Sequence, residues 1–144
     1  MEDSSQPIVV EQTYPVPRER VWEALTDPAQ MCQWFFKPIA EFEPRVGFST
    51  RFTVASGGIG FVHVWKVVEA VPNERLVLDW RYEGYPGDSS VEFVLVCEGD
   101  GTYLRMTHRG QGTFPQEVPE FGRDACTKGW EFFFCESLLG FLEG

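Results

Sequence analysis

The sequence contains two histidines, His63 and His108, and imidazole is the side chain best suited to proton transfer near neutral pH. Each falls on the face of an alternating pattern that we expect to point inward. One interpretation is a general base, or a polar anchor that orients a ligand's carbonyl, hydroxyl or carboxylate inside an apolar pocket. The other is a core or rim histidine hydrogen-bonded to backbone or water. No carboxylate stands at a spacing that identifies an orienting partner, so the sequence names no catalytic residue.

The remaining reactive side chains lack the spacing that catalysis or metal binding requires. Glycines 57, 58 and 60 are not followed by the helix and lysine of a phosphate-binding loop, and no serine-nucleophile motif is present. We therefore predict no metal site and no cofactor. The cysteines are scattered without zinc or disulfide spacing, which favours free thiols in a reducing compartment: Cys32, Cys97, Cys126 and Cys135.

Aromatic side chains carry the most informative signal, with 13 Phe, 5 Trp and 4 Tyr in 144 residues. Large rings from several elements point to one interior on the faces that we expect. As core alone, so many rings would be hard to pack without voids. As walls of a cavity, they would suit a planar or apolar ligand. The predicted ligand-binding residues are Trp34, Phe52, His63, Trp65, Trp80, Phe93, Met106, His108, Trp130, Phe134 and Ser137.

A long helix over residues 124–143 must position one wall of that interior. Helical spacing places one broad apolar stripe on it, formed by Trp130, Phe134, Ser137, Leu138 and Phe141 and widened by Phe133. The stripe is either the core partner of a sheet, or the small residues Ser137 and Gly140 leave space for a ligand. Phe132 and Leu139 fall on the opposite face, which is either exposed or covered by a second copy in a homodimer.

The N-terminal part supplies one strand and two short helices. Residues 1–6 have the character of a disordered tail, and residues 8–14 alternate and are rich in β-formers. Pro17 can open a helix over residues 18–25. The Asp27-Pro28 pair ends that helix, and a second one follows over residues 28–34. We expect Trp34 and the two phenylalanines after it to close this helix pair as a plug under the sheet.

From residue 39 to residue 109 the apolar residues recur with period two, which predicts strands. The first two form a hairpin around residues 45–47, and the glycines of residues 57–60 make the next turn. Residues 110–122 show no periodicity and predict a mobile loop over one mouth of the sheet. The expected strands span residues 39–44, 48–55, 60–71, 75–83, 90–98 and 102–109.

Strands followed by a long helix, with two short helices after the first strand, predict an α+β domain. A curved antiparallel sheet of six to seven strands would wrap around the C-terminal helix. The length of 144 residues is enough for one domain with its own core, so we predict a single domain over residues 1–144.

Charge and hydropathy argue against several classes of protein. The formal net charge is -10 and the isoelectric point is near 4.6, whereas nucleic acids and anionic membranes attract cationic surfaces. No stretch is long and apolar enough for a membrane span, and the N-terminus lacks the pattern of a signal peptide. We therefore expect a cytoplasmic protein that binds neither nucleic acid nor membrane.

Several short stretches in this order resemble the START/birch-pollen-allergen (SRPBCC) superfamily. Within it, the chain is similar to the family related to the C-terminal domain of the activator of heat-shock-protein ATPase. The resemblance implies a helix-grip fold with a hydrophobic cavity between the long helix and the sheet. It is a poor guide to function, because the fold hosts lipid carriers, cyclases, hormone receptors and co-chaperones. The matching stretches are residues 21–28, Trp34, residues 67–77 with Trp80, residues 98–102, residues 107–110 and Gly129-Trp130.

Three functions are consistent with these features. The leading hypothesis is a non-enzymatic protein that holds a small hydrophobic or aromatic ligand between helix and sheet, with His63 or His108 as polar anchors. The second is a co-chaperone-like interaction module that stimulates a heat-shock ATPase in the stress response. The third is a cyclase- or hydrolase-like enzyme that uses the same pocket, for which the sequence offers no acid–base pair.

Overall fold

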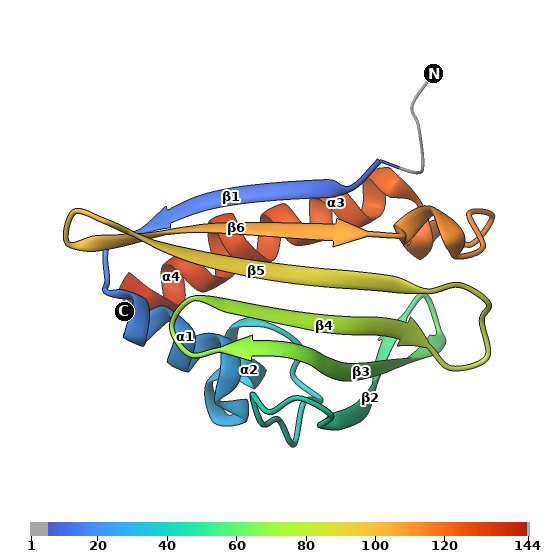
Figure 1. The fold of residues 1–144 in the computed structure, drawn as a ribbon. Coiled ribbons are helices and arrows are strands. Elements are labelled where there is room, and N and C mark those ends of the chain that lie inside the picture. The colour runs from blue at the N-terminus through green and yellow to red at the C-terminus, as the bar shows by residue number, and fades with distance from the viewer. Residues whose placement is uncertain (1–5, 144) are drawn as a thin grey trace.

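Six strands form one antiparallel sheet in the computed structural model, which describes residues 6–143. Their order across the sheet is β1-β6-β5-β4-β3-β2, so the first strand lies beside the last (Figure 1). The strands are β1 (Ile8–Tyr14), β2 (Ser49–Ser56), β3 (Ile59–Val71), β4 (Arg75–Tyr82), β5 (Ser89–Glu98) and β6 (Gly101–Arg109). The helices are α1 (Arg18–Thr26), α2 (Pro28–Trp34), α3 (Arg123–Glu131) and α4 (Leu138–Glu143), with a π-helical segment, η3 (Phe132–Ser137), between the last two.

The concave face of the curved sheet packs against the C-terminal helical segment, which crosses behind the strands in Figure 1. Alternation decides which side chains face the helix, because successive residues of a strand point to opposite faces. In β3, Phe61, His63, Trp65 and Val67 are buried, whereas Lys66 and Val68 are exposed. The side chains expected to face the interior from β4, β5 and β6 include Trp80, Phe93, Met106 and His108, and these are buried. Cys97, which alternation groups with Phe93, is exposed at the end of β5.

The two short helices after β1 form the expected plug. Asp27 separates them because its carboxylate accepts a hydrogen bond from Ala29 N at 3.1 Å and Pro28 opens α2. Trp34, at the end of α2, donates from Nε1 to Ala24 O at 2.8 Å and is buried. The ring of Phe35 stacks on Trp34 with a centroid distance of 4.7 Å. These two stacked rings attach α1 and α2 to the core.

The predicted strand over residues 39–44 is wrong, and with it the hairpin around residues 45–47. This segment is irregular, although Ile39 and Phe42 are buried. Their spacing of three does not fit a strand face, and Pro38 and Pro44 at its ends cannot donate to a ladder. The strand that follows pairs with β3 instead, through a turn in which Gly57 and Gly58 have φ values of 60° and 82°. The sheet therefore has six strands.

The C-terminal helix spans the predicted residues but is not a uniform α-helix. Its fully buried side chains are spaced by four: Trp130, Phe134, Leu138 and Leu142. In an α-helix each four-residue step rotates by about 40° beyond a full turn, so such a row would drift around the axis. The wider turns of η3 offset part of this drift and keep the row against the sheet. The predicted stripe members Ser137 and Phe141 are consequently only partly buried.

The loop over residues 110–122 contains two short 3₁₀ turns, η1 (Gln111–Thr113) and η2 (Pro119–Phe121). Phe114 and Phe121 pack with Phe61 of β3 in a second, smaller apolar cluster. Gln111 is buried and donates from Nε2 to Phe121 O at 2.6 Å. The loop thus covers one end of the sheet as expected, and its mobility stays a prediction.

Of the two apolar residues predicted on the outer face of the C-terminal helix, only one is exposed. Phe132 is 52% exposed, whereas Leu139 is partly buried against the core, contrary to its predicted position on the opposite face. The homodimer through this face stays a prediction. The predicted tail over residues 1–6 lies outside the described residues except for Gln6, whose carbonyl oxygen accepts from Arg123 Nη1 at 2.6 Å.

Candidate functional site

A cavity of about 150 Å³ lies between α3 and the concave face of the sheet. Strands β3, β4 and β6 supply one wall, α3 and the start of η3 supply the other, and η2 contributes one residue. Ala125 is exposed, so the cavity reaches solvent near the start of α3. The lining residues are Phe36, His63, Trp80, Tyr82, His108, Glu120, Ala125, Cys126, Gly129, Trp130 and Phe133.

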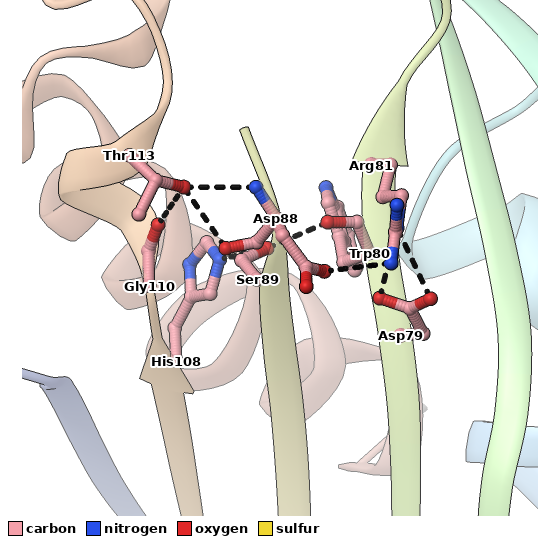
Figure 2. Close-up of polar contacts among 8 residues, drawn as sticks. All are labelled: Asp79, Trp80, Arg81, Asp88, Ser89, His108, Gly110 and Thr113. Atoms are coloured by element: carbon pink, nitrogen blue, oxygen red, sulfur yellow. Dashed lines mark hydrogen bonds and ion pairs between the residues drawn. The ribbon is translucent and has the colours of Figure 1, made fainter. Parts of the chain in front are cut away.

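His108 is held at this site by a chain of hydrogen bonds that fixes its tautomer. Trp130 Nε1 can only donate, and it lies 3.1 Å from His108 Nδ1, which must therefore accept. The proton of the neutral ring is then on Nε2, which donates to Ser89 Oγ at 3.0 Å. Ser89 in turn donates to Trp80 O at 2.7 Å (Figure 2). Burial lowers the pKa of His108 to about 4, so the ring is neutral at pH 7.

The contact between His108 and Ser89 does not form a nucleophile and its base. A catalytic base must accept the serine proton, but here His108 donates to Ser89 and the serine proton goes to Trp80 O. Both nitrogens of His108 are occupied within the protein. The structure therefore supports the interpretation of His108 as a buried, hydrogen-bonded histidine that fastens α3 to the sheet through Trp130.

His63 has the opposite tautomer and one unoccupied nitrogen. Its Nδ1 lies 3.1 Å from Phe61 O, and because a carbonyl can only accept, Nδ1 carries the proton. Nε2 then holds a lone pair, and no residue among 6–143 donates to it. The ring is 6% exposed, lines the cavity, and packs among aromatic rings, including Phe52 and Trp80. Burial lowers its pKa to about 4, since desolvation outweighs the bond to Phe61.

Tyr82 stands directly opposite His63 in the β3–β4 ladder, with the two ring centroids 4.8 Å apart. Its hydroxyl oxygen accepts from Trp80 Nε1 at 2.9 Å. The hydroxyl proton has no acceptor in the described part of the chain. Burial raises the pKa of Tyr82, which keeps this proton in place at any physiological pH.

The environment of the cavity disfavours charge of either sign. Burial lowers the pKa of both histidines and raises the pKa of the Cys126 thiol to about 11. Cys126 is therefore a protonated thiol, and its Sγ donates weakly to Glu120 O at 3.6 Å. The Glu120 carboxylate accepts from Ser56 Oγ at 2.9 Å, so its charge stands where the loop meets the strands.

A second depression of about 810 Å³ lies on the outer face of the sheet and is open to solvent. Arg81 lines it and pairs with Asp79 at 3.2 Å and with Asp88 at 3.3 Å (Figure 2). Partial burial, followed by a hydrogen bond with Asp88, raises the pKa of Asp79. Lys66 and Arg109 also line this groove, which is an open surface and not a space between helix and sheet.

The family model of the Activator of Hsp90 ATPase homolog 1-like proteins matches residues 15–143. The chain belongs to this family. Membership agrees with the resemblance carried by the sequence motifs and with the architecture, in which one long helix lies in the concavity of an antiparallel sheet. The protein therefore has the helix-grip fold.

Solved structures of the same architecture come from several organisms. CV1439 from Chromobacterium violaceum is 24% identical with a TM-score of 0.80, over 96% of this chain and 98% of that one. CalU16 from Micromonospora echinospora is 34% identical with a TM-score of 0.64, over 94% and 71%. PFC0360w, an Hsp90 activator from Plasmodium falciparum, is 19% identical with a TM-score of 0.72, over 96% of both chains. A comparison with curated proteins found no match.

The helix-grip architecture divides the predicted binding residues into two groups. His63, Trp80, His108 and Trp130 line the cavity. The others lie outside its lining: Trp34, Phe52, Trp65, Phe93, Met106, Phe134 and Ser137. Ser137, expected to leave space, instead donates from Oγ to Trp34 O at 2.6 Å and so contacts the plug. Whether any of these residues binds a ligand stays a prediction.

Several lining residues were not singled out from the sequence. Tyr82 alternates with the buried residues of β4, but no sequence pattern indicates that its hydroxyl proton lacks an acceptor. Glu120 lies in a segment without periodicity, so no pattern could place it, whereas Cys126 lies within the predicted helix but off its apolar stripe. Gly129 and Ala125 are small residues on the C-terminal helix. Small size could have indicated space beside them, as it did in the prediction for Ser137 and Gly140.

Further features of the described residues bear on the other predictions. All four cysteines have free thiols. Within residues 6–143, no cluster of three or more His, Cys, Asp or Glu side chains could hold a metal ion. The same residues include no helix of the length and apolar character that crossing a membrane requires.

Proposed function

We propose that this protein binds a small hydrophobic or aromatic molecule in the cavity between α3 and the sheet. The observation that carries the proposal is a space of about 150 Å³ inside an aromatic interior, bordered by Trp80, Trp130 and Phe133. Native cores leave few voids larger than a water molecule. A solvent-connected space of this size that rings border on several sides suits a small apolar ligand.

The volume limits the size of the ligand. Pockets for drug-sized molecules usually measure about 300–1,000 Å³, whereas an engineered apolar cavity of about 150 Å³ binds benzene. A single-ring compound therefore fits this cavity without rearrangement. Lipids and larger polyaromatic molecules would require α3 or the loop over residues 110–122 to move outward.

Binding is expected to stabilise the protein and to change tryptophan fluorescence, because Trp80 and Trp130 border the cavity. At a ligand concentration of about 100 times Kd, linkage adds about 2.7 kcal/mol to the free energy of unfolding. Gly129→Leu should abolish this effect, since a Cβ at Gly129 meets no atom within 4 Å and the longer side chain would occupy the cavity. The measurement is a thermal-shift and fluorescence titration with single-ring aromatic compounds.

Gly140→Leu is the matched control for this variant. Gly140 is also helical and also has open space around its Cβ position, but it lies outside the cavity lining. Both substitutions replace glycine by a better helix former, so neither should weaken the helix. Equal stabilisation by ligand in both variants would place the binding site elsewhere and contradict the proposal.

The second candidate is stimulation of a heat-shock ATPase, which family membership supports because the family is described by that activity. Adding the protein to Hsp90 should then raise the rate of ATP hydrolysis several-fold. Gly129→Leu should leave the increase intact if the contact is made through the surface. An unchanged ATPase rate at saturating protein would reject this candidate without affecting the first.

A further inference from the structure

Two neighbouring side chains of the cavity each have one hydrogen-bonding valence without a partner among the described residues, and the two valences are of opposite kind. His63 Nε2 is an acceptor, because the ring proton is on Nδ1, which donates it to Phe61 O. The Tyr82 hydroxyl has a proton to donate, because its oxygen already accepts from Trp80 Nε1. Neither free valence is satisfied by another described residue. Because both residues line the cavity, a molecule bound there could satisfy both valences.

The two residues are neighbours in the sheet and border the same cavity. His63 and Tyr82 are cross-strand partners in β3 and β4, and their rings meet edge to face with centroids 4.8 Å apart. Both line the same cavity. Their backbones belong to the middle of the sheet, which fixes the distance between them better than a loop would.

A hydroxyl group satisfies both valences at once. Its oxygen can accept from Tyr82 while its proton is donated to His63 Nε2. A ketone or an ether could only accept, and would leave His63 unpaired. A carboxylate could accept from Tyr82 but has no proton for His63.

The charge and shape of the cavity further restrict the chemical class of the ligand. Desolvation lowers the pKa of both histidines and raises the pKa of Tyr82 and Cys126, so an ion of either sign is disfavoured. The Glu120 carboxylate and a net charge of -10 act against anions in particular. The rings of Phe36, Trp80 and Trp130 surround a volume of about 150 Å³, which suits one aromatic ring.

We propose that the ligand is an uncharged phenol, a single aromatic ring whose hydroxyl accepts from Tyr82 and donates to His63. The inference rests on the proposed function, because it names the class of molecule that the same cavity binds. His108 takes no part in recognition, since Trp130 and Ser89 occupy both its nitrogens.

The test compares phenol with toluene, which has nearly the same size but no hydrogen-bonding group, and with benzoate, an anion. Calorimetric titration gives the phenol-to-toluene affinity ratio for the wild type and for Tyr82→Phe and His63→Phe. Each substitution leaves the ligand hydroxyl with one partner, and the ratio should fall by roughly 5- to 100-fold. Toluene affinity should change by less than about twofold, since the shape of the cavity is kept.

Tyr85→Phe is the control, because Tyr85 belongs to the second apolar cluster and does not line the cavity. Its affinity ratio should equal that of the wild type. Toluene binding by each variant also reports that the variant is folded with its cavity intact. Where a variant fails to bind toluene, the other variant and the wild-type ratio still decide the outcome.

The possible results distinguish failure of the phenol inference from failure of the proposed function. If phenol and toluene both bind but the ratio is the same in all variants, the cavity recognises rings by shape, and the phenol inference is overturned while the proposed function stands. Benzoate binding as tightly as phenol would also overturn it. If no single-ring compound binds the wild type, the proposed function itself fails.

Discussion

Phe134→Ala is expected to lower the free energy of unfolding by about 3–5 kcal/mol, the usual cost of truncating a fully buried aromatic residue. Phe134 is 0% exposed and connects three parts of the fold. Its ring lies 5.5 Å from Trp34 of the plug, 5.6 Å from Phe93 of β5 and 5.8 Å from Trp130 of α3. Removing it would leave a hole that rigid strands cannot close.

Urea unfolding at equilibrium measures this change, and the adjacent phenylalanine supplies the control. Phe132 is 52% exposed, so Phe132→Ala should change the free energy of unfolding by no more than about 0.5 kcal/mol. The comparison tests the register of η3, because a shift of the helix by two residues would exchange the two positions. Similar losses in both variants would contradict the helix placement.

The sheet was predictable because alternation is a local signal. From β3 to β6, the buried residues Trp65, Leu78, Phe93 and Met106 fall where period two puts them. The irregular segment over residues 39–44 was not predictable in the same way. Its apolar residues are buried in the main core. A buried irregular segment and a buried strand have similar apolar compositions, so composition does not show whether the segment hydrogen-bonds to a neighbouring strand.

The C-terminal helix shows a different limit. The spacing of apolar residues predicts that the helix exists and how far it extends. It does not predict η3, which changes the rotation per residue, because no residue type is specific for a π-helical segment. The small residues that border space were expected at Ser137 and Gly140 instead of at Ala125 and Gly129. The α-helical register assumed after Glu131 bears on Ser137 and Gly140, whereas Ala125 and Gly129 precede η3 and are not affected by it.

The candidate site depended on contacts between distant residues. The aromatic composition predicted an interior of rings, and alternation pointed His63 and His108 inward. Their different roles follow from their hydrogen-bond partners. Trp130 lies 22 residues from His108, whereas Phe61, whose carbonyl oxygen accepts from His63, is only two residues away in the same strand. A single sequence contains no signal for such pairings, so the two histidines looked alike.

Lowering the pH from 7 to 5 is expected to destabilise the protein by about 4 kcal/mol, with each histidine contributing about 2 kcal/mol. Burial holds the pKa of His63 and His108 at about 4 in the folded protein, whereas an unfolded histidine titrates near 6.5. Between these values the unfolded chain binds protons that the folded protein does not. Stability therefore falls as the pH drops through 6.5, and the loss is complete below about pH 4.

Asp79 acts in the opposite direction. Its pKa is raised in the folded protein, chiefly by partial burial and by Asp88, so its protonation favours the folded state as the pH approaches the carboxylate range. The histidine effect begins at higher pH, because an unfolded histidine titrates near 6.5 and an unfolded aspartate near 3.9. Urea unfolding at pH 7, 6 and 5 should consequently show a steady decline over an interval that the histidines dominate.

Substitution separates the two contributions, because His63 and His108 are the only histidines in the sequence. His63→Phe and His108→Gln should each remove about half of the decline, and the double variant should remove most of it. Glutamine can accept from Trp130 and donate to Ser89, which preserves the contacts of His108 without its titration. A folded protein whose two imidazoles both titrate near pH 6.5 by NMR would refute the burial argument. It would also remove the reason for assigning a fixed lone pair to His63, on which phenol recognition depends.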